Sequence, residues 1–310
     1  MMILSPDTHL STPSAATIGC FDGVHRGHQM LVQMMVRQAR QRGLKPIAVT
    51  FDRLPRQLFD PTFHPQLLST LEEKTACLKE LGVEEVIVLP FTHELASLSA
   101  EAFMREILRD RLSVELLVTG YDNRFGHDRN EGFDDYVRYG QTLGIDVVRG
   151  DVAMMDEQNA VSSTVIRQLL ADEGKVEAMP DVLTRRYTLS GRVVSGEHIG
   201  HELGFPTANL EPDSQEKLIP ACGAYAVWAM VDGHRMPAMM NIGTRPTFEG
   251  KQQTLEVHIL EDVGNLYGHS MTVEFVSRLR AEQRFDTREA LIAQLEHDRL
   301  TTEQLLLNNK

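Results

Sequence analysis

The chain has few of the residues that cross-link small proteins or embed a chain in lipid. Three of its 310 residues are cysteines, Cys20, Cys77 and Cys222, and no two of them form a CxxC pair. Disulfide frameworks and zinc sites are therefore not expected, and a reducing compartment, the cytoplasm, suits the chain. No apolar run approaches the roughly 18 residues of a membrane span. Residues 1–14 contain no Lys or Arg and no long apolar stretch, so a secretory signal is not expected.

Positive charge is also scarce. Lys and Arg number 31 against 44 Asp and Glu, which gives a formal net charge of −13. Nucleic-acid binders need clustered Lys and Arg, so we expect neither a nucleic-acid nor a membrane partner. Hydrophobic residues make up 42% of the chain and charged residues 24%, as in ordinary globular proteins. The length suits about two domains, and we expect small-molecule substrates and a monomer or weak homo-oligomer.

The first half of the chain alternates strand-like and helix-like segments. Short apolar stretches precede amphipathic ones, several of which end at a glycine such as Gly43 or Gly144. Strands separated by helices indicate a parallel sheet built from right-handed crossover units, a Rossmann-like α/β domain. We expect strands at 15–21, 45–51, 83–89, 115–120 and 145–148, and helices at 27–42, 72–81, 100–112, 133–143 and 162–171.

The second half lacks long helices until its end. Turn signals such as Asp232-Gly233 separate strand-like segments, which is typical of an antiparallel unit. A small antiparallel β-barrel with a C-terminal helix packed on it is therefore expected. The rhythm changes within 172–186, so we predict domains at 1–178 and 179–310. We expect strands at 187–194, 223–232, 234–242, 254–261 and 271–279, and a helix at 287–307.

A glycine-rich turn with two histidines joins the first expected strand to the first helix, and it reads GCFDGVHRGH at 19–28. Gly23 and Gly27 carry no Cβ, so the backbone can approach a phosphate closely. The amino end of the helix adds unpaired N–H groups and a dipole that favours anions. His25 and His28 can donate hydrogen bonds to phosphate oxygens. The motif is neither a Walker loop, since no Gly-Lys-Ser/Thr follows, nor a GxGxxG fingerprint.

Three further segments of the first half suit ligands. TFDRLPR at 50–56 and VTGYDNRFGHDR at 118–129 follow expected strands, whose carboxyl ends are where parallel sheets hold ligands. VSSTVIR at 161–167 offers hydroxyls at the start of a helix and an arginine that can clamp a triphosphate. Because the chain is acidic, anionic ligands need local positive charge. The expected suppliers, together with Mg²⁺, are His25, His28, Arg124, Arg129 and Arg167.

A second glycine-rich loop, SGEHIGHELGFPTAN at 195–209, follows the first strand of the second half. Gly196, Gly200 and Gly204 give the loop its freedom. Thr207 and Asn209 offer hard oxygens two residues apart, on the same side of an extended chain. Such oxygens suit a Mg²⁺ ion that bridges ATP phosphates.

These motifs resemble a known family. The 19–28 turn is similar to the HxGH nucleotidyltransferases, and the PTAN segment at 206–209 is similar to the riboflavin kinase signature. With the flanking segments, including RLRAEQRF at 278–285, the chain resembles bacterial bifunctional riboflavin kinase/FAD synthetases over roughly residues 15–305. The resemblance implies that the C-terminal module phosphorylates riboflavin to FMN with ATP. It implies that the N-terminal module adenylylates FMN to FAD with release of pyrophosphate, both modules using Mg²⁺.

The resemblance also implies roles for single residues. His25, His28 and Arg167 assist attack of the FMN phosphate on the α-phosphorus of ATP, and Glu256 takes the proton of the riboflavin 5′-hydroxyl. The implied ATP-binding residues are Gly19, Phe21, Asp22, Gly23, Gly27, Ser162, Ser163, Thr164, Gly196, Gly200 and Gly204. The implied flavin-binding residues are Asp122, Arg124, Phe125, Arg280 and Phe285. The implied Mg²⁺ ligands are Thr207 and Asn209.

Several positions depart from the family pattern and leave alternatives open. Arg53 replaces a proline, Asn123 an aromatic residue and His201 an arginine. A single-activity enzyme with one degenerate module is therefore one alternative. A second is an adenylyltransferase for pantetheine phosphate or nicotinamide mononucleotide joined to an unrelated β domain, which the PTAN segment disfavours. A third is a non-catalytic flavin or nucleotide sensor, which would not need His25, His28 and Glu256.

Overall fold

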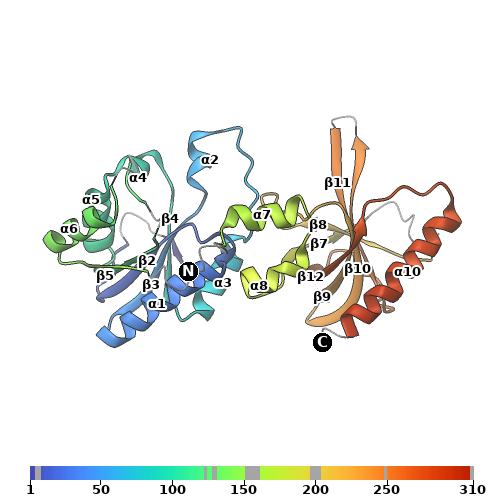
Figure 1. Ribbon diagram of the computed structural model, residues 1–310, viewed down its shortest axis with the longest axis horizontal. Helices are drawn as coiled ribbons and strands as arrows, with labels where there is room; N and C mark the ends of the chain where they lie inside the picture. The colour runs from blue at the N-terminus through green and yellow to red at the C-terminus, as the bar shows by residue number, and fades with distance from the viewer. Residues whose placement is uncertain are drawn as a thin grey trace. The chain divides into compact units, whose positions relative to one another are not determined.

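A computed structural model of the chain describes residues 1–3, 8–121, 124–127, 131–150, 161–195, 204–247 and 250–307, without the side chains of 245–247 and 250–252. The chain forms two compact units, Met1–Ser162 and Ser163–Lys310. Figure 1 draws both, and each is described by itself. The predicted division at 178/179 stays a prediction.

A six-stranded parallel sheet is the centre of the first unit, with strand order β1-β4-β3-β2-β5-β6. The chain builds the sheet outward from β2 in one direction through β3 and β4, and then in the other through β5 and β6. The order therefore reverses between β2 and β5, and ligands bind at the carboxyl ends of strands that flank such a reversal. The strands are β1 (Met2–Ile3), β2 (Ser14–Ile18), β3 (Lys45–Phe51), β4 (Glu85–Leu89), β5 (Val114–Thr119) and β6 (Asp146–Arg149).

Helices cover both faces of this sheet, as Figure 1 shows. Successive side chains of a strand point to opposite faces, so Ala16 packs in one core cluster, with α5 and α6, and Ala15 in another, with α1 and α3. Both faces are buried, which explains why the middle of each central strand is apolar. The helical segments are η1 (Asp22–Val24), α1 (Arg26–Arg42), α2 (Pro55–Phe59), α3 (Leu71–Glu80), α4 (His93–Ser97), α5 (Ala100–Ala102), the π-helix η2 (Phe103–Arg109) and α6 (Phe133–Leu143).

A closed antiparallel barrel is the centre of the second unit, with strand order β10-β11-β8-β7-β12-β9. The predicted tight hairpin is confirmed, since Val231 pairs with His234 around Asp232 and Gly233, whose φ angles are 51° and 81°. One strand, β8, had been interpreted as the exit of a loop. The strands are β7 (Thr188–Val194), β8 (Ala208–Pro212), β9 (Gly223–Val231), β10 (His234–Thr247), β11 (Gly250–Ile259) and β12 (Ser270–Ala281).

Helices flank the barrel at both ends of the second unit's sequence. The helical segments are α7 (Ser163–Ala171), η5 (Val176–Ala178), α8 (Met179–Leu183) and α10 (Arg288–Leu307), the last of which is drawn in red along the barrel in Figure 1. The carbonyl of Leu170 in α7 accepts a hydrogen bond from Ala221 N at 2.9 Å, which ties α7 to the residues before β9. None of the helices in the described ranges is long and apolar enough to cross a membrane.

Candidate active sites

The turn after β2 is held in an unusual backbone conformation. Phe21, Gly23 and Val24 have φ angles of 48°, 78° and 42°, in the left-handed region that glycine adopts most easily. The Asp22 carboxylate fixes this turn by accepting hydrogen bonds from Leu68 N (2.9 Å) and Ser69 N (3.1 Å). The Ser69 hydroxyl in turn accepts a bond from Gly23 N at 2.9 Å. Side-chain bonds from a distant segment therefore set the shape of the glycine-rich turn.

The two histidines of the turn lie against each other at the start of α1. Their rings stack with centroids 3.7 Å apart, and the ring of Phe21 meets His28 edge-on at 5.4 Å. Burial lowers the pKa of His28 to about 3, and the positive charges of His25 and Lys74 act in the same direction. His28 is therefore neutral at physiological pH. It can donate one hydrogen bond to a phosphate oxygen but carries no positive charge there.

Lys74, a residue of α3 that the sequence analysis did not single out, lies buried beneath this turn. Its Nζ donates to the carbonyl of Cys20 (2.9 Å), the hydroxyl of Thr50 (2.9 Å) and the carbonyl of Phe51 (3.4 Å). It thus joins the segments that follow β2 and β3. Burial lowers its pKa from the ordinary lysine value. The sequence carried a signal for its burial, because Lys74 lies four residues before Leu78 and therefore on the same, buried face of the helix predicted at 72–81.

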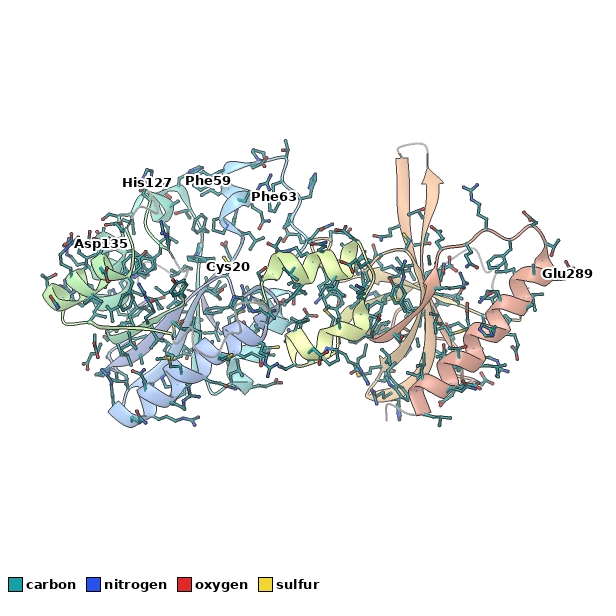
Figure 2. All side chains as sticks on the ribbon, viewed as in Figure 1. Cys20, Phe59, Phe63, His127, Asp135 and Glu289 are labelled. Atoms are coloured by element: carbon teal, nitrogen blue, oxygen red, sulfur yellow. The ribbon has the colours of Figure 1, made fainter. Side chains whose placement is uncertain are left out.

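A cavity of about 820 Å³ lies at the carboxyl end of the parallel sheet. Three of the predicted ligand-binding residues line it, Gly19, Arg124 and Phe125. Its wall also contains Phe51 and His127, which lie in the segments expected to suit ligands at 50–56 and 118–129. Other aromatic and histidine lining residues were missed because they come from separate segments, namely Phe59, Phe91, His93 and Phe103. Figure 2 labels Phe59 and His127 together with Cys20, another lining residue. A cavity of this size with aromatic walls suits a flat ligand of cofactor size.

Phe125 is held in this wall by Tyr136 of α6. The two rings stack at 4.1 Å and 15°, and the Tyr136 hydroxyl accepts a hydrogen bond from Phe125 N at 3.0 Å. The Tyr136 hydroxyl also donates toward Phe125 O at 3.2 Å. The predicted flavin contact therefore sits on a rigid support.

The remaining predicted residues of this site fall into four groups. Phe21 and Asp22 are buried, with 1% and 6% of their surfaces exposed, and Asp22 is engaged with the backbone at 68–69. Gly27 lies in the first turn of α1. Ser162 ends the first unit, whereas α7 of the second unit carries Ser163, Thr164 and Arg167. Asp122 lies outside the described residues, as do Asn123 and Arg129. Binding of ATP by these residues stays a prediction.

On the barrel, three polar residues form a row across neighbouring strands. Glu256 of β11 pairs with Asn241 of β10 on one side and with Asn209 of β8 on the other. Residues paired in this way project from the same face of a sheet. The flanking Leu255 and Val257 are buried in the barrel, so Glu256 projects from its outer face. Strand register thus brings the predicted base next to a predicted Mg²⁺ ligand.

A cavity of about 340 Å³ opens on this face and reaches α10. Glu256, Asn241 and Thr207 line it, together with the two predicted flavin-binding residues, Arg280 and Phe285. The Arg280 guanidinium lies 5.6 Å from the Phe285 ring centroid. Its Nε donates to Asp298 of α10 at 2.9 Å, and Gln294 Nε2 donates to the same carboxylate at 2.8 Å. These bonds fix Arg280 at the edge of the cavity.

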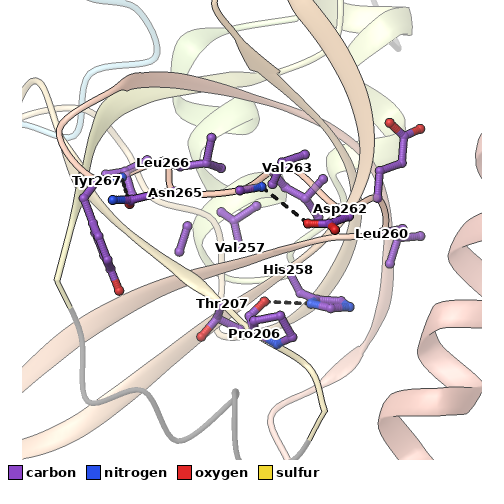
Figure 3. Close-up of a pocket in the computed structure, with 15 residues that line it drawn as sticks. Pro206, Thr207, Val257, His258, Leu260, Asp262, Val263, Asn265, Leu266 and Tyr267 are labelled. Carbon is purple, nitrogen blue, oxygen red and sulfur yellow. Dashed lines mark hydrogen bonds between the residues drawn. The ribbon is translucent and has the colours of Figure 1, made fainter.

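A second barrel cavity, of about 600 Å³, is drawn in Figure 3. Thr207 and His258 line both this cavity and the 340 Å³ one. The imidazole of His258 lies 2.8 Å, through Nδ1, from the Pro206 carbonyl, and Figure 3 shows this bond. Burial lowers the pKa of His258. His258 was not assigned a role from the sequence, although its place two residues after Glu256 on the same strand puts it on the same face.

The predicted loop glycines of this site are described only in part. Gly204 has a φ of +81° and open space where a Cβ would lie. Gly196 and Gly200 lie outside the described residues, as does His201. Their contact with ATP stays a prediction.

Comparison with known proteins bears directly on both units. A family model described as FAD synthetase matches residues 7–165, and one described as riboflavin kinase matches residues 183–306. A protein of Escherichia coli (strain K12) named bifunctional riboflavin kinase/FMN adenylyltransferase is 37% identical over 289 residues, which cover 93% of this chain and 91% of that protein. A protein of the same name from Pseudomonas fluorescens is 39% identical over 277 residues, covering 89% of this chain and 88% of that protein.

A solved structure shares the fold over almost the whole chain. A crystal structure from Streptococcus pneumoniae, named as a macrolide-efflux protein, matches with a TM-score of 0.89 and 30% sequence identity, covering 97% of this chain and 98% of that one. Its name describes an activity that neither matching family model describes. Both halves of the chain match family models, and the relatives span nine-tenths of it. The chain therefore belongs to the bifunctional riboflavin kinase/FMN adenylyltransferase family, with a FAD synthetase domain and a riboflavin kinase domain in one polypeptide.

Proposed function

We propose that the barrel unit transfers the γ-phosphoryl group of ATP to the 5′-hydroxyl of riboflavin, and that the parallel-sheet unit transfers the adenylyl group of ATP to the FMN so formed. The observation that carries the first step is the row on the barrel, where Glu256 lies opposite Asn209 beside a cavity shared with Thr207. The second step is supported by the stacked His25 and His28 at the amino end of a helix.

In the kinase step the two barrel cavities take different substrates. The flavin occupies the 340 Å³ cavity against Phe285 and Arg280, and the nucleotide occupies the 600 Å³ cavity, so the phosphoryl group passes near Thr207, which lines both. Glu256 accepts the proton of the riboflavin 5′-hydroxyl while the hydroxyl oxygen forms a bond to the γ-phosphorus. The bond between the γ-phosphorus and the β,γ-bridging oxygen breaks at the same time, and ADP leaves.

A magnesium ion fits the residues of this site. The described residues contain no cluster of three or more His, Cys, Asp and Glu side chains that would enclose a metal. Mg²⁺ in nucleotide sites needs no such cage, because it takes most of its ligands from water and phosphates. The Thr207 hydroxyl and the Asn209 amide oxygen, beside the shared wall of the two cavities, would hold it. When bound, the ion neutralises phosphate charge.

In the adenylyl step an FMN phosphate oxygen bonds to the α-phosphorus of ATP while pyrophosphate leaves. The flavin ring lies in the 820 Å³ cavity beside Phe125 and Arg124. His25 and His28 donate hydrogen bonds to phosphate oxygens, and the backbone of the turn at Gly23 and Gly27 approaches them. The serine–threonine segment at 162–164 and Arg167 bind the triphosphate. In the ligand-free chain His28 is neutral, so there it offers a hydrogen-bond donor rather than a positive charge.

Product analysis tests this proposal. The protein is incubated with riboflavin, ATP and Mg²⁺, and flavins are separated by chromatography; we expect FAD to accumulate. His28→Ala is expected to stop at FMN, and Glu256→Gln to leave riboflavin unchanged while still converting added FMN. His297→Ala, at an exposed position of α10, is the matched control and retains both steps.

Each failed outcome has a definite meaning. Accumulation of FMN alone by the unsubstituted chain identifies a single-activity enzyme. No conversion of any flavin overturns the proposal in favour of a sensor or of an adenylyltransferase for another nucleotide, which an assay with pantetheine phosphate or nicotinamide mononucleotide distinguishes. FAD formation by His28→Ala at the normal rate overturns the first site, and FMN formation by Glu256→Gln at the normal rate overturns the role of the carboxylate.

A further inference from the structure

Pairing between β8 and β11 stops one residue short of Thr207. The two recorded pairs are Glu256 with Asn209 and Val257 with Ala208. Continuing this antiparallel register would set His258 opposite Thr207, but Pro206 has no N–H to extend a backbone ladder. The His258 side chain makes the next contact instead, at 2.8 Å from the Pro206 carbonyl. Thr207 is therefore held on one side by the strand pair and on the other by an imidazole.

We propose that His258 is a positioning residue for the phosphoryl-transfer site, which fixes the Pro206–Thr207 peptide so that the Thr207 hydroxyl faces the shared wall of the two barrel cavities. This inference rests on the proposed kinase function of the barrel. Nothing in it requires His258 to touch substrate or to exchange a proton.

The chemistry of the contact defines what His258 must supply. A carbonyl oxygen only accepts hydrogen bonds, so Nδ1 must carry the proton and donate it. The ring also packs edge-on against Phe205, with centroids 5.3 Å apart, and Phe205 is 8% exposed. The imidazole therefore anchors two successive residues ahead of Thr207, one by packing and one by a hydrogen bond. In metal sites, substituting a residue that orients a metal-binding residue from behind typically changes metal affinity or activity by about 10- to 100-fold.

Two substitutions separate the hydrogen bond from the packing. His258→Phe keeps an aromatic ring against Phe205 but removes the donor, whereas His258→Asn keeps an N–H close to the position of Nδ1 but removes the ring. His269→Phe is the matched control, because His269 also bonds through Nδ1, to Asp232 at 2.8 Å, outside both cavities.

The full-length chain is measured in two ways. Riboflavin phosphorylation is followed against Mg²⁺ concentration, with FMN adenylylation in the same sample as the control for folding. Hydrogen–deuterium exchange of the ligand-free chain is followed in the peptide that covers residues 204–210. His258→Phe is expected to lower kcat/KM for riboflavin phosphorylation by about 10- to 100-fold, to raise the half-saturating Mg²⁺ concentration severalfold, and to speed exchange in 204–210.

His258→Asn is expected to restore most of the phosphorylation rate and the slow exchange, and His269→Phe to leave both unchanged. The inference is overturned if His258→Phe matches the original chain in rate and exchange, or if His258→Asn is as impaired as His258→Phe. Hydrogen–deuterium exchange needs no turnover, so it tests the positioning role of His258 even if the original chain makes no FMN. Failure of the original chain to make FMN would overturn the proposed function instead.

Discussion

Lys74 is a buried cation whose three hydrogen bonds end at the carboxyl edge of the parallel sheet. A buried charge without partners is expensive, so three oxygen acceptors are the least that such a residue needs. Its charge also reaches His28, since it lowers the pKa of that imidazole. A buried residue that was not predicted to bind substrate therefore influences the protonation state of the predicted catalytic residue His28.

At the residue scale, His28 is expected to resist protonation. Its pKa is about 3 in the folded chain against the ordinary 6.5, so the unfolded chain binds a proton here between these pH values and the folded chain does not. The free energy of unfolding therefore falls as pH drops from about 6.5 towards 3 and is insensitive to this group above 6.5. Histidine NMR resonances followed from pH 8 to 5 should show no titration of His28, and His28→Phe should remove its share of the stability slope.

Removing the buried charge should change that behaviour. Lys74→Met keeps the length of the side chain but not its positive charge, so we expect the pKa of His28 to rise. Lys74→Arg keeps the charge and serves as the control. An NMR titration extended to about pH 3 compares both variants with the original chain, and an unchanged pKa of His28 in Lys74→Met would show that Lys74 exerts no effect on it.

At the scale of elements, hydrophobic spacing located most helices and strands, but it did not reveal the π-helix or the strand β8. The helix predicted at 100–112 is a short α-helix followed by the π-helix η2, in which bonds such as Asp110 N to Arg105 O span five residues. The π-helix η2 is only seven residues long, too short for its wider turn to alter the apolar spacing clearly, so the sequence does not distinguish the two. The strand β8 was missed because its pairing with β7 and β11 is supplied by residues far along the chain.

Close contact between β7 and β8 should make Gly191 irreplaceable. A Cβ at this position would lie 2.2 Å from the Glu211 carbonyl oxygen, which is backbone and cannot move aside alone. Gly191→Ala is expected to destabilise the barrel by about 1–3 kcal/mol. Because β8 carries Asn209, riboflavin phosphorylation should fall while FMN adenylylation persists.

Chemical denaturation of the full-length chain and the two activity assays measure this effect. Gly132→Ala is the control, because no atom lies within 4 Å of the added Cβ, and its cost should be about 1 kcal/mol or less. Equal losses for both substitutions would show that the packing at Gly191 is not tight.

At the scale of the whole molecule, the two-domain fold and the family could be predicted because the motifs that carry the resemblance are short and local; the roles of the site residues stay predictions. His25 and His28 are three positions apart, and Glu256 was found through the segment around it. Phe59 and Phe91 could not be found in this way, because they reach the cavity from other segments through tertiary packing. The position of Lys74 on a buried helix face was readable from the sequence, but its three acceptors on other segments were not. Local spacing thus nominates candidate groups, whereas the contacts that hold them emerge only from the fold.

The division of the chain can be tested with fragments. The Arg278 guanidinium donates to Glu173 O at 2.9 Å, and Ala221 N donates to Leu170 O at 2.9 Å, so residues before 179 support the barrel. A fragment of residues 163–310 is therefore expected to melt roughly 5 °C or more above one of residues 179–310. Both should form FMN and neither FAD. Equal melting temperatures by circular dichroism would support the division predicted at 178/179.

Asp22 accepts its hydrogen bonds from Leu68 and Ser69, which lie 46 and 47 positions further along the chain. This separation has a practical consequence for protein engineering. The ten-residue histidine turn cannot be transferred to another protein by itself, since hydrogen bonds with a distant segment hold its backbone. A transplant into another nucleotidyltransferase scaffold would have to bring Leu68 and Ser69 with it, or install substitutes for their two amides and one hydroxyl, before the imidazoles could stack.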